Sequence, residues 1–203
     1  MPHKGIFSQG LVVLLSDSAA LDEVENLLTE FGPPTRKPTF EDWEFSGPAI
    51  VLPYRPDVNG YVSVDLVERP WPDDMGNPKE KPILFGAWSM GHFGPCTFPG
   101  NLSRAVQQSW SWPAAKELVP RHKAFVRVRS SYIFGAGPQA KCLPADYAPL
   151  PELQFLTAII KALLENPNAL AYFNPGGEVL MGASELNAAT TFAKSHSLPP
   201  LDV

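Results

Sequence analysis

Few residues of this chain have side chains that could do chemistry, and no two of them form a familiar motif. The histidines and cysteines are His3, His92, His122, His196, Cys96 and Cys142. No pair of histidines has the HExxH spacing of a zinc protease, and the HFGPC stretch from His92 to Cys96 predicts a loop with too few metal ligands. A Cys96 nucleophile activated by His122 is one alternative, because such partners meet only in space. We therefore predict no bound metal or cofactor.

Two other patterns also fall short of a catalytic motif. The Gly135-Ala-Gly137 stretch follows a predicted strand, but Pro138 comes next instead of a helix, and the Lys-Ser/Thr pair of a phosphate-binding loop is absent. The acidic pairs Asp73-Asp74 and Glu41-Asp42 stand in predicted loops, where carboxylates are usually solvated. The alternative that these residues leave open is an enzyme or small-ligand-binding domain, with a pocket built around His92, Cys96, His122 and Arg127.

The charged residues are divided unevenly along the chain. There are 16 basic and 21 acidic residues in all, for a net charge of −5. Residues 17–44 contain eight acidic and two basic side chains, whereas residues 104–141 contain seven basic and one acidic. Two patches of opposite sign could orient charged partners. Alternatively, these charges are solvated or pair with each other across the fold.

The composition argues against several classes of function. The pI of about 5.4 lies far below the value of roughly 9 that is typical of a nucleic-acid-binding domain, so direct nucleic-acid binding is not expected. The longest aliphatic run, residues 11–15, is much shorter than the roughly 20 apolar residues of a membrane-spanning helix. The first residues do not combine a basic region with a following apolar stretch, so no export signal is expected. We therefore expect a cytoplasmic protein with no membrane partner and with reduced cysteines.

Apolar periodicity predicts the elements that must position these residues in the first half of the chain. The aliphatic segment 9–15 predicts a buried strand. Ser16, Asp17 and Ser18 offer N-cap oxygens for a helix with an apolar face from Leu21 to Phe31. Apolar pieces at 49–52 and 61–67 predict strands, the second with alternating faces. The prolines that cluster between residues 33 and 113 predict edge strands, turns and loops.

The second half of the chain predicts a further set of helices and strands. Asn101 is expected to cap a helix reaching about Trp110, and Pro113 to begin a short helix that reaches Val119. The segment 123–133 predicts a strand with Phe125, Arg127 and Arg129 on one face. The remaining predicted elements are a helix over 151–166, a hairpin over 169–180 and a last helix capped by Ser184. We predict a single α+β domain over 1–203, a mostly antiparallel sheet packed by three to four helices, with 196–203 as a loose tail.

Three stretches in the second half resemble a bacterial family catalogued as a domain of unknown function. They are the WSWPAA stretch (Trp110 to Ala115), the RHKAFVRV stretch (Arg121 to Val128) and the YFNPGGEVL stretch (Tyr172 to Leu180). The resemblance covers roughly residues 91–180 and carries no catalytic residues over to this chain. Small bacterial α+β proteins of this kind look like immunity proteins, which neutralise a toxin in bacterial competition, for example one delivered by type VI secretion.

The resemblance therefore implies a cytoplasmic immunity-type protein that is not an enzyme and that blocks the active site of a cognate toxin. Because many such toxins are nucleases with a basic cleft, the acidic stretch 22–44 could fill that cleft as a phosphate mimic, with Phe40 and Trp43 as apolar anchors. The aromatic residues near the basic segment suit an interface as well. The predicted partner-binding residues are Glu23, Glu30, Phe40, Glu41, Asp42, Trp43, Glu44, Trp110, Trp112, Arg127 and Arg129.

Overall fold

A computed structural model describes residues 6–37, 44–136 and 140–198 of the chain. Its centre is one seven-stranded sheet in the order β2-β3-β4-β5-β1-β6-β7, in which each pair of neighbouring strands is antiparallel. The strands are β1 Gln9–Leu15, β2 Thr35–Lys37, β3 Ala49–Arg55, β4 Gly60–Val67, β5 Ala124–Ser131, β6 Ala169–Asn174 and β7 Val179–Met181. The predicted α+β class and antiparallel sheet are confirmed.

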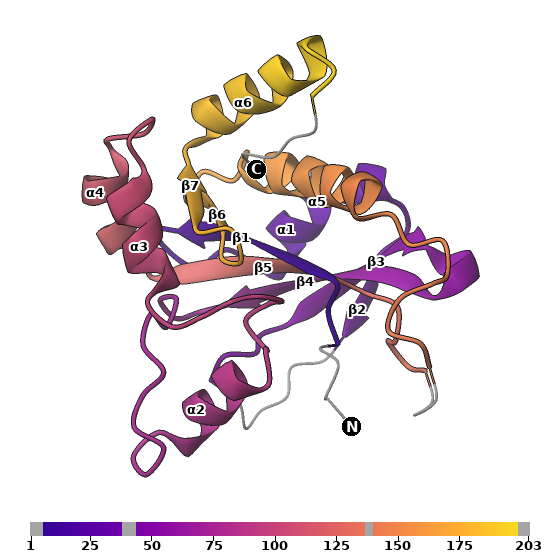
Figure 1. Cartoon of the computed structure of the whole chain (residues 1–203), viewed down its shortest axis with the longest axis horizontal. Coiled ribbons are helices and arrows are strands. Elements are labelled where there is room, and N and C mark those ends of the chain that lie inside the picture. The colour runs from indigo at the N-terminus through magenta and orange to yellow at the C-terminus, as the bar shows by residue number, and fades with distance from the viewer. Residues whose placement is uncertain (1–5, 38–43, 137–139, 199–203) are drawn as a thin grey trace.

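Helices lie against both faces of this sheet, with α1 and α5 on one side and α2 on the other (Figure 1). The helices are α1 Leu21–Leu27, α2 Pro82–Ser89, α3 Asn101–Gln108, α4 Ala115–Leu118, α5 Pro149–Leu163 and α6 Ala183–Ser195. In the described ranges there are thus six helices, more than the three to four expected. Short 3₁₀ turns occupy Thr29–Phe31, Pro56–Val58 and Val119–Arg121.

The first hydrophobic core lies between the sheet and the helices α1 and α5. Alternate residues of the central strands point into it, such as Val64 of β4 and Val126 of β5. The buried stripe of α5 packs against them through Leu156, Ile160 and neighbouring aliphatic residues. The period of two along the strands and the period near four along the helix bring these apolar side chains together.

The second hydrophobic core, on the opposite face, is aromatic. Trp71 lies at its centre, with its ring centroid 5.2 to 5.4 Å from those of Phe93, Phe125 and Phe173. Side chains from α2, α3 and α4 close this core, which covers the sheet at β1, β5 and β6. Towards β2, β3 and β4 the same face carries polar residues and a cavity instead.

Most predicted elements are present; α2 and β2 were not predicted, and the other corrections concern the ends of elements. Segment 9–15 is β1 as predicted, but the first helix begins after Ala20 and ends at Leu27, so Ser16 to Ser18 do not cap it. Gly182, not Ser184, precedes the last helix. Asn101 does not cap α3 but is its first residue. The distant Asp73 instead accepts hydrogen bonds from the first amides of that helix. Of the predicted tail, residues 199–203 lie outside the described ranges.

Candidate ligand-binding site

A buried cluster of Asp65, Arg127 and Arg129 lies on the polar part of the second sheet face. Strands β4 and β5 place Asp65 directly opposite Arg127, and Arg129 lies two residues further along β5 on the same face. The Arg127 guanidinium donates from Nε and Nη2 to the two oxygens of Asp65, at 3.2 and 2.5 Å. Arg129 Nη2 donates to Asp65 Oδ1 at 3.0 Å. All three residues are at most 5% exposed.

Main-chain and aromatic contacts hold the two guanidinium groups in place. Arg127 Nη2 also donates to the carbonyl oxygen of Phe45 at 2.9 Å, and Arg129 Nη1 donates to the carbonyl oxygen of His92 at 2.8 Å. The guanidinium carbon of Arg129 lies 4.0 Å from the centroid of the Phe7 ring, a cation–π contact. The cluster is therefore a fixed feature of the sheet face.

The protonation states in this cluster follow from burial and mutual charge. Burial alone would raise the pKa of Asp65, but the charges and hydrogen bonds of Arg127 and Arg129 outweigh it and hold that pKa below its usual value. Burial and the neighbouring Arg127 lower the pKa of Arg129 to about 9, so it remains a cation at neutral pH. Burial and the two guanidinium groups lower the pKa of His92, so its imidazole is neutral. These four residues together carry one net positive charge.

A cavity of about 750 Å³ borders this cluster. Its volume lies within the range of roughly 300–1,000 Å³ that is common for small-molecule sites. Its wall combines apolar and polar side chains, because the same sheet face presents Ala49 and Val51 of β3 and Ser63 and Asp65 of β4 to it. The lining residues are Thr35, Ser46, Gly47, Ala49, Val51, Asn59, Tyr61, Ser63, Asp65, His92, Arg129, Phe134 and Gly135.

The structure separates the four residues of the pocket predicted from sequence. Only His92 lines the cavity, while Arg127 lies in the adjoining cluster. Cys96 is exposed, with a left-handed backbone φ of 58°. His122 accepts a hydrogen bond at Nε2 from the main-chain N–H of Trp71, at 2.9 Å. Neither Cys96 nor His122 borders the cavity, so the predicted Cys–His pairing has no support from the structure.

The structure also changes the physical account of His122. In the sequence His122 stands between Arg121 and Lys123, whose positive charges would be expected to lower its pKa. The pKa is indeed lowered, but the cause is burial of the imidazole, opposed in part by its contact with the carbonyl oxygen of Val119. Because Nε2 accepts a hydrogen bond from Trp71, the neutral ring carries its proton on Nδ1. His122 is therefore a structural link.

The predicted partner-binding residues fall into three groups. Glu23, Glu30 and Glu44 are exposed, and Glu44 pairs with Arg69 at 3.3 Å. Phe40, Glu41, Asp42 and Trp43 lie outside the described residues. The others come from the basic segment, where Trp110 is 84% exposed but Trp112, Arg127 and Arg129 are buried. The prediction that these three residues contact a partner at the surface is therefore corrected, because packing and ion pairs bury their side chains.

Ion pairs explain where much of the basic charge goes. Arg127 and Arg129 pair with Asp65, and Lys123 lies 3.8 Å from Asp17 in the acidic segment. Arg121 pairs with Glu117 one helical turn away, at 2.5 Å. Of these contacts, the one between Lys123 and Asp17 joins the two charged segments, whereas the others pair basic residues with acids outside residues 17–44.

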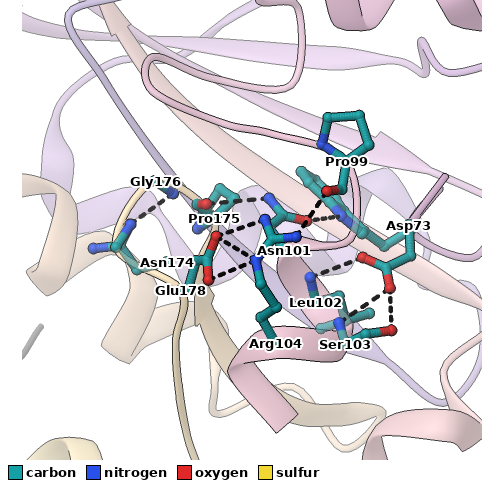
Figure 2. A network of polar contacts seen from close by, with 12 residues as sticks. Asp73, Pro99, Asn101, Leu102, Ser103, Arg104, Asn174, Pro175, Gly176 and Glu178 are labelled. Atoms are coloured by element: carbon teal, nitrogen blue, oxygen red, sulfur yellow. Dashed lines mark hydrogen bonds and ion pairs between the residues drawn. The ribbon is translucent and has the colours of Figure 1, made fainter. Parts of the chain in front are cut away.

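A second polar network joins α3 to the hairpin of β6 and β7, as Figure 2 shows. Arg104 donates from Nε and Nη2 to Glu178 at 2.7 to 2.9 Å. The fully buried Asn101 donates to the carbonyl oxygen of Pro175 at 3.1 Å and accepts from Trp71 Nε1 at 3.1 Å. Asp73 accepts from two main-chain amides at the start of α3. The charges of Arg104 and Glu178 balance, and the network is a structural tie.

Sequence reasoning found Arg127, Arg129 and His92 but missed the acid that organises them. Asp65 stands 62 residues before Arg127, and only the pairing of β4 with β5 brings the two together. One signal was present: Asp65 alternates with Val62, Val64 and Leu66 in a predicted strand whose other face is apolar.

Comparisons with known proteins add no assignment to this site. Neither a protein-family model, nor a curated protein, nor a solved structure matches the chain. Within the described ranges, no group of three or more His, Cys, Asp or Glu residues could hold a metal ion. Among the helices described, none has the length and apolar character needed to cross a membrane.

Proposed function

We propose that this protein binds a small molecule in the cavity bordered by Asp65, His92 and Arg129. The observation that carries the proposal is the position of a buried, charged cluster at the wall of a cavity of ligand size. Small-molecule sites typically combine apolar walls with a few fixed polar groups. Here the walls come from β3 and β4, and the fixed groups come from the cluster.

Stability alone is a weak explanation for this cluster. Taking charges out of water is costly, and buried ion pairs are often no more stabilising than apolar residues of similar volume. Ionic groups with perturbed pKa values that face a cavity are more common at functional sites. The cluster therefore supports binding better than it supports a purely structural role.

A ligand screen with a cavity-filling variant tests the proposal. Ala49 lines the cavity and pairs with Asp65 on the neighbouring strand, so Ala49→Phe places a ring in the cavity while leaving the charged residues themselves unchanged. Ala188→Phe on the exposed side of α6 is the matched control. A ligand at 100 times its Kd should stabilise the unmodified chain by about 2.7 kcal/mol, a Tm rise of roughly 5–11 °C.

We expect such ligands to stabilise the unmodified chain and the Ala188→Phe control but not the Ala49→Phe variant. The proposal fails if no compound in a screen of acids, amides, amines and phosphate esters gives this difference. It also fails if the ligands found stabilise the Ala49→Phe variant as strongly as the control.

A second candidate function is the immunity-type role, which one observation favours. Trp110 is 84% exposed after the end of α3, and exposed tryptophans are enriched at the centre of protein interfaces. The expected partner is a toxin encoded next to this protein. Co-purification with that neighbour and rescue of growth should both be lost in Trp110→Ser, and Phe98→Ser at another exposed aromatic residue is the control. Charge reversal at Glu41, Asp42 and Glu44 separately tests the phosphate-mimic mode.

A further inference from the structure

The charged cluster beside the cavity is not balanced within the described part of the chain. Arg127 and Arg129 contribute two positive charges, and Asp65 is the acid that contacts both. Arg127 and Asp65 act electrostatically on Arg129, and the two guanidinium groups act on His92 alongside a hydrogen bond with the Phe45 backbone. An isolated buried charge is costly unless a counter-charge approaches it.

Two guanidinium nitrogens of the cluster also have hydrogen-bonding capacity left over. Nη1 of Arg127 and Nε of Arg129 are buried and have no hydrogen-bond partner among the residues described. Buried donors are nearly always paired, so each unused one calls for an explanation. Arg129 lines the cavity, which places a guanidinium group with one unused donor at the cavity wall.

We propose that the ligand is a small organic monocarboxylate whose carboxylate pairs with Arg129; this inference rests on the proposed binding function. Arginine is suited to carboxylates because its planar guanidinium donates several hydrogen bonds in a fixed geometry. One carboxylate supplies the single negative charge that the cluster lacks. A phosphate ester dianion would bring one charge too many, since His92 is neutral and adds no positive charge.

The rest of the cavity suits the organic part of such an acid. Val51 and Phe134 offer apolar surface, and Tyr61 adds a ring with a polar end. Thr35 provides a hydrogen-bonding group away from the cluster, whereas the amide nitrogen of Asn59 already donates to the carbonyl oxygens of Tyr132 and Phe134. Asp65 acts as a positioning residue, because it holds both guanidinium groups on the sheet face and would repel a second anion.

Calorimetric titration of the full chain with matched probes tests the inference. The probes are benzoate and hexanoate, their neutral amides benzamide and hexanamide, phenyl phosphate, and hexylamine, all at one ionic strength. We expect the acids to bind at least about tenfold more tightly than the amides, because a hydrogen bond to a charged group is lost in the amide. Phenyl phosphate and hexylamine should bind more weakly than the acids.

A variant and a spectroscopic readout assign the effect to Arg129. Arg129→Gln should weaken the acids by about tenfold or more and leave the amides unchanged. If that variant does not fold, nuclear magnetic resonance of arginine Nε–H groups in the unmodified chain gives the answer. One buried Nε–H resonance should shift on adding benzoate and should not shift on adding benzamide.

The possible results separate this inference from the proposed function. Amides that bind as tightly as the acids, or phenyl phosphate that binds more tightly, would overturn the carboxylate inference while leaving a ligand site in place. Acids that bind without any shift of an Nε–H resonance would overturn the role of Arg129. Absence of binding by every probe overturns the inference, and the broader screen with Ala49→Phe then decides the proposed function on its own.

Discussion

Replacing Asp65 with alanine should destabilise this protein strongly, because the change leaves two buried guanidinium groups without their acid. Asp65 accepts three hydrogen bonds, two from Arg127 and one from Arg129, at 2.5 to 3.2 Å. Removing one partner of a buried ion pair typically costs about 3–5 kcal/mol. Because Asp65 borders the cavity, water can reach the freed guanidinium groups, and we expect a loss near the lower end, about 3 kcal/mol.

Urea unfolding of Asp65→Ala measures this loss against two controls. Asp57→Ala removes an acid that is 71% exposed and 4.0 Å from Arg55, and should change the free energy of unfolding by no more than about 0.5 kcal/mol. The triple variant Asp65→Leu, Arg127→Met, Arg129→Leu replaces all three charged residues with apolar ones. Its free energy of unfolding should lie within about 1 kcal/mol of that of the unmodified chain, or be higher. A loss below about 1 kcal/mol in Asp65→Ala would refute the account of a strongly coupled buried cluster.

Four further substitutions test the same cluster and other parts of the structure. The folded-state pKa of Asp65 lies below its value of about 3.9 in an unfolded chain. The contribution of Asp65 to stability is therefore present above about pH 4 and is lost as the pH falls through the folded-state pKa. The difference in unfolding free energy between the unmodified chain and Asp65→Asn should shrink from pH 7 to pH 3. Asn101→Ala leaves the buried Pro175 carbonyl unpaired and should cost about 1–3 kcal/mol in urea unfolding. Gly47→Ala would place a Cβ 1.4 Å from a carbonyl oxygen of β4 and should lower the Tm sharply, whereas Gly86→Ala in α2 meets no atom within 4 Å and should stabilise by about 0.5–1 kcal/mol.

Elements with a strong apolar pattern could be predicted from the sequence, and elements made by their neighbours could not. The run 9–15 is buried on both faces as β1, and its composition alone predicts a strand. The helix α2 was missed because PILFGAWS is apolar nearly throughout and contains Gly86, so it shows no contrast between two faces. The three residues of β2 form a strand only through their pairing with β3.

The candidate site shows the same division between local and long-range information. Alternation along the strand correctly placed Arg127 and Arg129 on one face. Their burial could not be predicted, because arginines are mostly exposed unless paired and the pairing acid lies on a different strand. The cavity depends on where the aromatic core ends on the sheet face, which is a property of packing that no single segment encodes.

The Asp65 cluster and the Arg104–Glu178 network differ in a way that points to binding at the first of them. Arg104 and Glu178 balance each other in charge, their side chains are 41% and 23% exposed, and they tie a helix to a hairpin. The Asp65 cluster is buried, carries an excess positive charge, retains two unused donors and borders a cavity. An ion pair that served only to hold the fold would gain by being balanced, as the pair of Arg104 and Glu178 is. The excess positive charge of the Asp65 cluster is therefore best explained by an anion that completes the cluster from the cavity.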